Sequence, residues 1–262
     1  EKCVSPPAHK VFSTPRELVQ FVAEMRRLAH GKPVGFKLCV SSSQEFLAIC
    51  KAMRLEQITP DFIIVDGGEG GTGAAPLEYE NRVGTPLTEG LLMVHNALVG
   101  TGLRDRIRIG AAGKVATGAD IVRRLAQGAD YTNAARAMMM ATGCIQSQRC
   151  QTNTCPVGVA TQDPRRQRAL DVGDKSLRVE RYHRSTVEEA CQIIASMGLH
   201  TPDDLRPEML RRVVGQLQTR SYAEMYDWLD DGELLAEPPE AWANDWALAD
   251  PDSFHHAIQE NR

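Results

Sequence analysis

Short apolar segments alternate with segments of helical periodicity over the first half of the chain, and this alternation limits the possible folds more than any other feature. We expect strands at residues 32–40, 61–68, 106–113 and 130–136. We expect helices at residues 15–30, 43–53, 88–99 and 118–129. Strands that alternate with helices form a parallel sheet with right-handed crossovers, and ligands bind at the carboxyl ends of such strands. The sequence therefore predicts an α/β fold with a site at those ends.

The second part of the sequence lacks this alternation. After residue 165 we expect no further strand, and helical patterns occupy residues 175–197, 203–217 and 221–235. The Pro- and Trp-containing stretch 236–254 is expected to pack irregularly on the surface. The chain thus offers four β/α units, whereas a closed barrel of this type needs eight.

Composition narrows the class of protein. A net charge of −4 with 24% charged residues indicates an ordinary globular protein without a basic nucleic-acid-binding footprint. No apolar run approaches the roughly 20 residues of a membrane-spanning helix. Four cysteines lie singly, at positions Cys3, Cys39, Cys50 and Cys191. This scatter favours reduced thiols and a cytoplasmic location over a disulfide framework.

A glycine-rich stretch directly follows the second expected strand. Residues 65–76, VDGGEGGTGAAP, contain five glycines. Glycine lets the main chain approach a flat or charged ligand closely and adopts a positive φ at no steric cost. The position after a strand favours a ligand-binding loop, and the alternative is a mobile surface loop.

Residues 109–136 have the pattern of a strand, a tight loop, a helix and a strand. In barrels that bind phosphate, such loops and a short helix N-terminus form the anion site. Gly113 and the main chain after it would supply N–H donors, and Lys114 or Arg136 would add positive charge. The alternative is an ordinary β/α turn with surface cations.

Lys37 stands inside an apolar strand, VGFKLCV. A buried lysine has a large desolvation cost unless an anion or a dipole compensates it, so we expect Lys37 to point into a site at the carboxyl end of its strand. A reduced flavin, negative around N1 and O2, would be such an anion. The alternative is a lysine that extends to solvent at the edge of the strand.

Three further cysteines lie close together in GCIQSQRCQTNTCPVGVATQ, residues 143–162. Cys144, Cys150 and Cys155 are separated by five and then four residues. Zinc sites usually take four ligands in closer pairs, and disulfides would leave one cysteine over. Three thiolates on one loop suit an iron–sulfur cluster. Spacing alone leaves both a cluster and three unrelated thiols open.

Together these motifs resemble the glutamate synthase family. The Cys-x5-Cys-x4-Cys segment with TCPVGVATQ is similar to the family's iron–sulfur loop. SPPAH before a helix, KL in a strand, GGTGAAP and TGADIV are similar to successive segments of its flavin domain, in the same order. The similarity extends from Val4 to about Leu205. The resemblance implies a (β/α)8 barrel of the TIM type, with bound FMN and a [3Fe–4S] cluster.

The resemblance also assigns site residues. Lys37 would face the flavin and the substrate as a catalytic residue. The loop at the flavin's edge would contain Gly67, Gly68, Gly70, Gly71 and Thr72. The phosphate-binding segments would contain Gly113, Lys114, Asn133, Ala135 and Arg136. The cluster ligands would be Cys144, Cys150 and Cys155. Typical members have Gly-x-Gly-Thr where this chain has NAAR, so either Arg136 replaces hydroxyl and main-chain contacts by charge or the phosphate binds differently.

The matched segments correspond to the second half of the family's barrel. We therefore expect residues 1–165 to form that half, including the iron–sulfur loop 143–162, and residues 166–262 to form a mainly helical C-terminal extension. The first half would lie upstream on the same chain or on another chain. The start at Glu1 fits a processed or truncated product.

The implied reaction is reductive amination. 2-Iminoglutarate, formed from 2-oxoglutarate and ammonia, would be reduced to L-glutamate. Electrons would come from ferredoxin or an NAD(P)H-dependent subunit and pass through the cluster to FMN, and a hydride would go from flavin N5 to the imine carbon. Two alternatives remain. One is an FMN enzyme acting on another amine or acceptor, as in N-methylglutamate formation, and the other is a non-catalytic electron-transfer subunit.

Overall fold

A four-stranded sheet organises the fold. Its strands are β1 (Gly35–Leu38), β2 (Phe62–Asp66), β3 (Arg108–Ala112) and β4 (Tyr131–Asn133), in the order β1-β2-β3-β4. The computed structural model describes residues 9–69 and 83–254. All four strands lie within the predicted segments, which confirms the α/β class. Closure of the sheet into a barrel stays a prediction.

The chain divides into two compact units. The first unit comprises residues 1–64, 93–109 and 228–262, and the second comprises residues 65–92 and 110–227. Each unit is therefore built from stretches that are distant in sequence. Helix α3 (Leu87–Gly100) contributes its first turns to the second unit and its remainder to the first.

The predicted start of the helix over residues 15–30 is confirmed in the first unit. Helix α1 (Pro15–Leu28) begins with a capping box in which the Thr14 hydroxyl accepts the Glu17 N–H, and the Glu17 carboxylate accepts the Thr14 N–H. Proline at the first helical position fits because its missing N–H is not needed there. Helix α2 (Ser43–Glu56) packs on α1. A short 3₁₀ turn, η1 (Arg104–Arg106), precedes β3.

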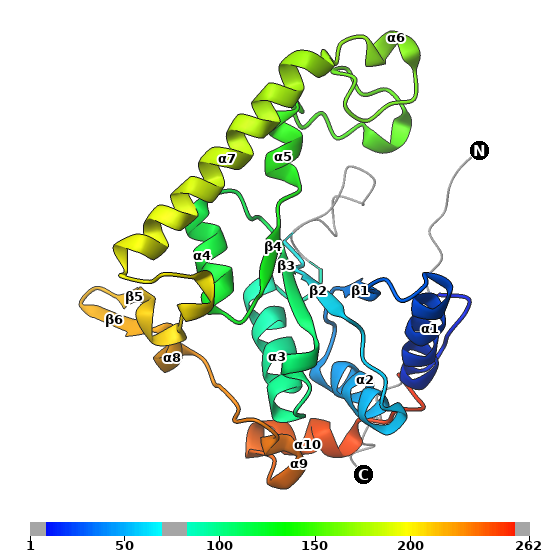
Figure 1. The fold of residues 1–262 in the computed structure, drawn as a ribbon, viewed down its shortest axis with the longest axis vertical. Helices are drawn as coiled ribbons and strands as arrows, with labels where there is room; N and C mark the ends of the chain where they lie inside the picture. Colours follow the sequence, from blue (N-terminus) through cyan, green and yellow to red (C-terminus); the bar gives the residue numbers. More distant parts are fainter. Residues whose placement is uncertain (1–8, 70–82, 255–262) are drawn as a thin grey trace. The chain divides into compact units, whose positions relative to one another are not determined.

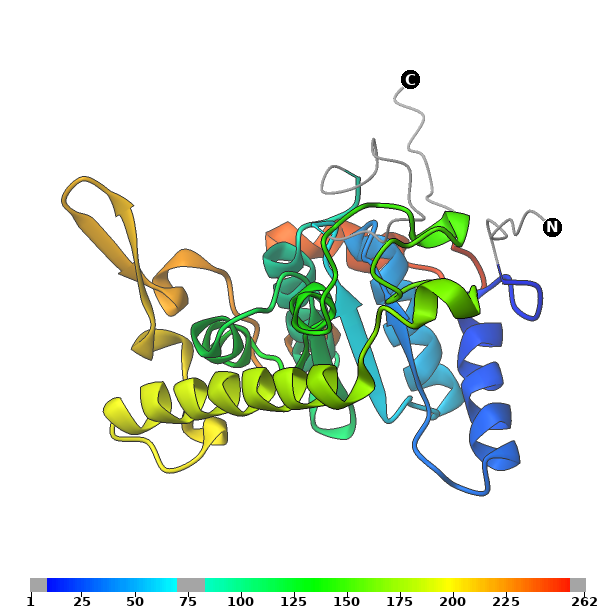
Figure 2. The same cartoon turned by 90° about the horizontal axis from the view of Figure 1, so that it is seen from above.

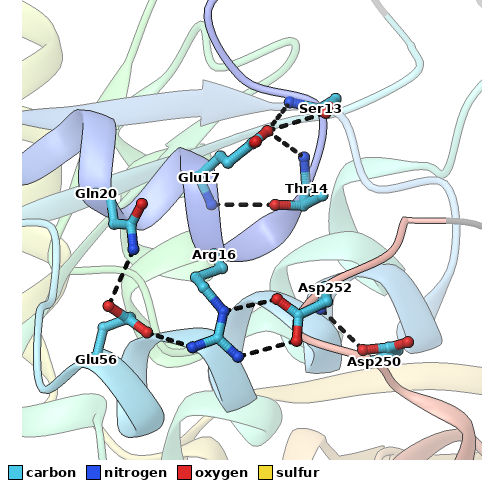
Figure 3. Close-up of polar contacts among 8 residues, drawn as sticks. All are labelled: Ser13, Thr14, Arg16, Glu17, Gln20, Glu56, Asp250 and Asp252. Carbon is cyan, nitrogen blue, oxygen red and sulfur yellow. Dashed lines mark hydrogen bonds and ion pairs between the residues drawn. The ribbon is translucent and has the colours of Figure 1, made fainter.

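Arg16 joins α1 to α2 and to the C-terminal segment of the first unit (Figure 3). Its guanidinium donates to both carboxylate oxygens of Asp252, at 2.6 and 2.9 Å, and to Glu56 at 2.6 Å. The Gln20 amide donates to the second oxygen of Glu56 at 3.1 Å. A bidentate arginine–carboxylate pair of this kind has the fixed geometry that isolated surface ion pairs lack.

The expectation of an irregular surface tail over residues 236–254 is wrong for its central part. Helix α10 (Glu240–Leu248) follows two prolines, which place the chain in an extended conformation before the helix begins. Helix α9 (Glu233–Ala236) precedes it, and Leu234 on α9 is 0% exposed. A Cβ added at Gly100 would lie 2.6 Å from Leu234 Cγ, so the glycine makes room for this leucine. Leu234 lies just before the stretch 236–254, within which Ala249 is buried and α10 has no buried residue, so the helix is the part that the expectation missed.

In the second unit, the long helix α7 (Val172–Ser196) runs beside α4 (Gly118–Ala126) and α5 (Arg136–Ala141) (Figure 1). Val122 of α4 packs with Ala190 and Ile194 of α7 in a small core. The prediction of a helix over 175–197 is confirmed. Helix α6 (Pro164–Gln167) and the 3₁₀ turn η2 (Cys150–Thr152) precede α7.

The predicted helix over 203–217 is wrong, and so is the absence of strands after residue 165. An antiparallel hairpin of β5 (Arg211–Gly215) and β6 (Gln218–Ser221) lies there (Figure 2). It is flanked by the elements η3 (Pro202–Asp204), η4 (Pro207–Met209) and α8 (Tyr222–Met225). Pro202 and Pro207 stand at the first position of the two short 3₁₀ turns, and a proline within a continuous helix over this range would remove a hydrogen bond. The β-branched Val213 and Val214 favour a strand. The helix predicted over 221–235 is confirmed only at the two ends of that range, in α8 (Tyr222–Met225) and α9 (Glu233–Ala236).

We find no helix in the described ranges, 9–69 and 83–254, whose length and apolar character would let it cross a membrane.

Candidate functional site

Three of the predicted segments meet in the second unit, at the carboxyl ends of β2, β3 and β4. Ala112, the last residue of β3, is paired with Asn133, the last residue of β4. The N–H of Gly67, the first residue after β2, donates to the Ala112 carbonyl at 2.8 Å. The predicted loops therefore begin side by side, at the edge of a parallel sheet where ligand sites form.

Gly67 and Gly68 are required by close packing within the chain. A Cβ at Gly67 would lie 1.9 Å from Glu69 Oε2, and a Cβ at Gly68 would lie 2.5 Å from the Gly84 carbonyl oxygen. These approaches explain the two glycines without a ligand. Gly70, Gly71 and Thr72 lie outside the described residues.

Glu69 is a site residue that the sequence reasoning missed. Both of its carboxylate oxygens lie 2.9 Å from the N–H of Leu87, the first residue of α3. The same carboxylate approaches Gly67 and would be 3.5 Å from a Cβ at Gly113. The signal in the sequence was a single acid among five glycines directly after a strand.

The turn after β3 has unusual backbone geometry. Gly113 and Lys114 have φ of +152° and +49°, so two successive residues adopt positive φ, and Lys114 is exposed. Such a turn changes the direction of the main chain sharply, as anion-binding loops require. The prediction that this turn contributes to an anion site stays a prediction, and the geometry is compatible with it.

The N-terminus of α4 is occupied by carboxylates of this chain. Asp120 accepts the N–H groups of Ala116 and Thr117, each at 3.1 Å, and Glu189 of α7 accepts the N–H of Gly118 at 2.9 Å. Burial alone would raise the pKa of Asp120, but these N–H groups hold it below its ordinary value. An anion would meet two carboxylates here. The Glu69 carboxylate also lies near the turn at residues 113–114, so a phosphate at that turn stays a prediction.

The segment after β4 is shorter as a strand than predicted. β4 ends at Asn133, and α5 begins at Arg136 with Ala135 as its N-cap. Asn133 and Ala135 are exposed, and Arg136 is partly buried. The pairing of Asn133 with Ala112 brings this segment next to the turn after β3.

Lys37 is exposed on β1. The expectation of a buried Lys37 is wrong, because the side chain is exposed. Lys37 belongs to the first unit, whereas the other predicted residues belong to the second. Its role toward flavin and substrate stays a prediction.

All three clustered cysteines carry free thiols on the loop 143–162. Cys144 and Cys150 are partly buried, and Cys155 is buried at 5% exposure. The N–H of Gln146 points to the Cys144 sulfur at 3.4 Å. Burial would raise the pKa of Cys155, but the N–H groups of residues 157–160 bind its sulfur and hold the pKa below its ordinary value. These contacts favour the thiolate, which is the form that binds metal.

Asn153 closes the part of this loop that surrounds Cys155. Its side-chain oxygen accepts the Gln162 N–H at 2.6 Å and the Thr161 hydroxyl at 3.0 Å. The Thr161 hydroxyl also contacts the Asn153 carbonyl at 2.8 Å. Asn153 has a φ of +60°, which asparagine tolerates better than most residues.

The described residues contain no group of three or more His, Cys, Asp or Glu side chains that are arranged to hold a metal ion. The three thiols have the right chemistry for an iron–sulfur cluster, but the structure does not bring them around one point. The expected [3Fe–4S] site is therefore not evident in this arrangement of the loop.

Comparison with known proteins identifies the family. The model described as "Conserved region in glutamate synthase" matches residues 1–200. The glutamate synthase large subunit-like protein YerD of Bacillus subtilis (strain 168) is 41% identical over 198 residues, which are 76% of this chain and 38% of that protein. The ferredoxin-dependent glutamate synthase 1 of Arabidopsis thaliana is 32% identical over 212 residues, 79% of this chain and 13% of that protein.

This chain thus spans well under half the length of these relatives. Among solved structures, a mutant flavocytochrome b2 with pyruvate bound is 16% identical with a TM-score of 0.44, covering 78% of this chain and 43% of that one. A similarity at that level does not establish a common fold, and the assignment depends on the sequence matches. The chain belongs to the glutamate synthase family.

Proposed function

We propose that this chain is part of an oxidoreductase that uses FMN and a [3Fe–4S] cluster to reduce 2-iminoglutarate to L-glutamate. One observation carries the proposal. In a chain of the glutamate synthase family, the turns after β2, β3 and β4 begin side by side at the carboxyl edge of the sheet. Cofactors of parallel α/β proteins usually bind at that edge.

The residues at this edge suit the phosphate end of FMN. The turn at Gly113 and Lys114 and the adjacent segment from Asn133 to Arg136 would hold the phosphate, because they combine main-chain N–H groups with two cationic side chains. Bound FMN would supply the hydride chemistry that reduces an imine. The chain's own contribution is to fix the cofactor's orientation and to neutralise its charge.

Lys37 is proposed as the residue that faces the flavin ring and the substrate. An ammonium group at the carboxyl end of a strand stabilises negative charge on a flavin or on a dicarboxylate substrate. Its exposure on β1 leaves the side chain accessible to such a ligand. The loop from Gly67 to Thr72 is proposed as the wall at the flavin's edge.

Cys144, Cys150 and Cys155 are proposed as the cluster ligands. The donor chemistry supports this, since all three are free thiols and thiolates are the usual ligands of iron–sulfur clusters. The hydrogen bonds to the Cys155 sulfur are of the kind that tune such clusters. The loop must rearrange to bring the three sulfurs around one cluster, because they do not converge in the described structure.

We further propose that the electron donor is either ferredoxin or an NADPH-dependent subunit. Relatives are named as ferredoxin-dependent and as NADPH-dependent glutamate synthases. The remaining wall of the FMN site is proposed to come from polypeptide outside this chain, on the same or another protein molecule.

The test is a spectrum and an assay on the full protein purified without oxygen. We expect bound FMN in a ratio near one per chain, iron in the sample, and glutamate formation from 2-oxoglutarate and ammonia with a reduced donor. Replacing ammonia by methylamine is the matched control for another amine substrate. A protein that contains neither flavin nor iron would refute the proposal.

A further inference from the structure

Glu69 makes a contact that its neighbours in the sequence do not predict. Its carboxylate accepts the N–H of Leu87 with both oxygens at 2.9 Å and thereby caps α3. A carboxylate at a helix N-terminus satisfies an unpaired donor and interacts favourably with the helix dipole. The capped helix starts 18 residues after the acid, so Glu69 joins two ends of a long connection.

The same carboxylate lies between the turns after β2 and β3. A Cβ at Gly67 would fall 1.9 Å from Glu69 Oε2, and a Cβ at Gly113 would fall 3.5 Å from it. Main-chain hydrogen bonds also connect this region. The N–H of Gly67 donates to the Ala112 carbonyl, and the N–H of Gly68 donates to the Thr85 carbonyl, each at 2.8 Å.

Arg124, a buried cation, binds the first turn of α3 as well. Arg124 of α4 is only 5% exposed, and its guanidinium donates to the Thr88 hydroxyl at 2.7 Å and to the Gln127 amide oxygen at 2.9 Å. Both acceptors are neutral, and the Nε of Arg124 has no partner among the described residues. Burial lowers the pKa of Arg124 and the charge of Arg123 adds to this, whereas the charges of Glu69 and Asp120 act in the opposite direction. A buried cation needs such compensation.

We propose that Glu69 is a positioning residue for the ligand site at the carboxyl edge of the sheet. It holds the turns after β2 and β3 together through the start of α3, and its charge compensates Arg124, which holds the next residue of that helix. The proposal deepens the proposed function, since the ligand of these turns is the flavin. An amide at this position would still cap Leu87 but would leave Asp120 as the remaining carboxylate that compensates Arg124.

The first test does not need the flavin. Amide hydrogen exchange at Gly67, Gly68 and Leu87 is measured in the apoprotein for Glu69→Ala and for the control Glu89→Ala. Glu89 is an exposed acid in the same first turn of α3. Loss of a helix cap should raise the exchange rate of all three amides about fivefold or more in Glu69→Ala. Unchanged exchange at these amides, or an equal change in the control, would overturn the proposal.

The second test separates charge from shape by a double-mutant cycle. Glu69→Gln keeps an acceptor oxygen for Leu87 and removes the charge, while Arg124→Met removes the buried cation at similar size. We expect Glu69→Gln to lower the folding equilibrium constant several-fold, and to lower it clearly less in the Arg124→Met background. Equal effects in both backgrounds would show that the two charges are not coupled and would refute this part of the proposal.

The third measurement connects positioning to the ligand. FMN affinity of the full protein is followed by flavin fluorescence. Weaker binding by about fivefold or more in Glu69→Ala, with Glu89→Ala unchanged, is expected from the same loss of capping. A wild-type protein that binds no FMN would refute the proposed function, and the exchange data would still decide the role of Glu69. Faster exchange with unchanged FMN affinity would overturn the role in ligand positioning.

Discussion

Replacing Gly118 by alanine should destabilise the second unit, although alanine is the better helix former. Gly118 is the first residue of α4 and lies against α7. A Cβ at this position would be 2.4 Å from the main-chain N of Ala190 and 2.8 Å from Glu189 Cβ. Carbon contacts are optimal at about 3.5–4.0 Å, so α4 and α7 must separate by about 1 Å. The obstacle is main chain, which cannot rotate away.

The expected magnitude follows from two opposing effects. Alanine in place of glycine in a helix gains at most about 0.5–1 kcal/mol. Overpacking of a close contact costs about 1–3 kcal/mol. The separation also lengthens the 2.9 Å hydrogen bond from the Gly118 N–H to Glu189. We therefore expect a net loss of about 1–2 kcal/mol, or about 2–8 °C in melting temperature.

Urea denaturation of the full protein measures this loss, and Gly173→Ala is the matched control. Gly173 is the second residue of α7, where a Cβ would meet only the Asp171 carboxylate at 3.3 Å. That side chain can move, so the control should be neutral or slightly stabilising. If Gly118→Ala is as stable as the wild type, the close approach of α4 and α7 is wrong.

Four further predictions follow from other parts of the chain. Leu234→Ala should cost about 2–5 kcal/mol in urea denaturation because the side chain is fully buried, and a value below about 1 kcal/mol would contradict the packing of α9 against Gly100. Arg16 holds the pKa of Asp252 below its ordinary 3.8, so this pair stabilises the fold above that pH and loses its effect as the pH falls through the lowered pKa. The stability difference between wild type and Arg16→Met should accordingly shrink as the pH falls below 3.8 and through the lowered pKa, and a constant difference would contradict the pairing. Cys150→Ser should lower the iron content of anaerobically purified protein, and unchanged iron would exclude Cys150 as a ligand. Lys37→Met should weaken flavin reduction without changing the melting temperature, and an equal loss of both would indicate a structural lysine.

Local signals predicted much of the fold. The start of the first helix and the four strands could be located because helix-start signals and short apolar runs act within a few neighbouring positions. The helix predicted over 203–217 failed for an equally local reason. Leu205, Met209, Val213 and Leu217 repeat every four residues and imitate an amphipathic helix. In the structure Leu205 is buried while Leu217 is 100% exposed, so no continuous apolar face exists.

The site was less predictable than the fold, because its contacts are long-range. The sequence indicated the glycines, but Glu69 could only be recognised from its contact with Leu87, 18 residues away. The occupation of the α4 N-terminus by Glu189 depends on a residue 71 positions away. The exposure of Lys37 also depends on which elements cover β1, and no pattern within the strand reports that.

The return of residues 228–254 to the first unit has a consequence for the order in which the protein folds during synthesis. The second unit is complete in sequence once residue 227 has been made, whereas the first unit still lacks Leu234, its partner Leu229 beside Gly100, and the Asp252 that binds Arg16. The N-terminal segment of the first unit must therefore wait for residues that are made after the whole of the second unit. During that interval the apolar surface around Gly100 is uncovered, which makes nascent chains that stall near residue 227 candidates for chaperone binding.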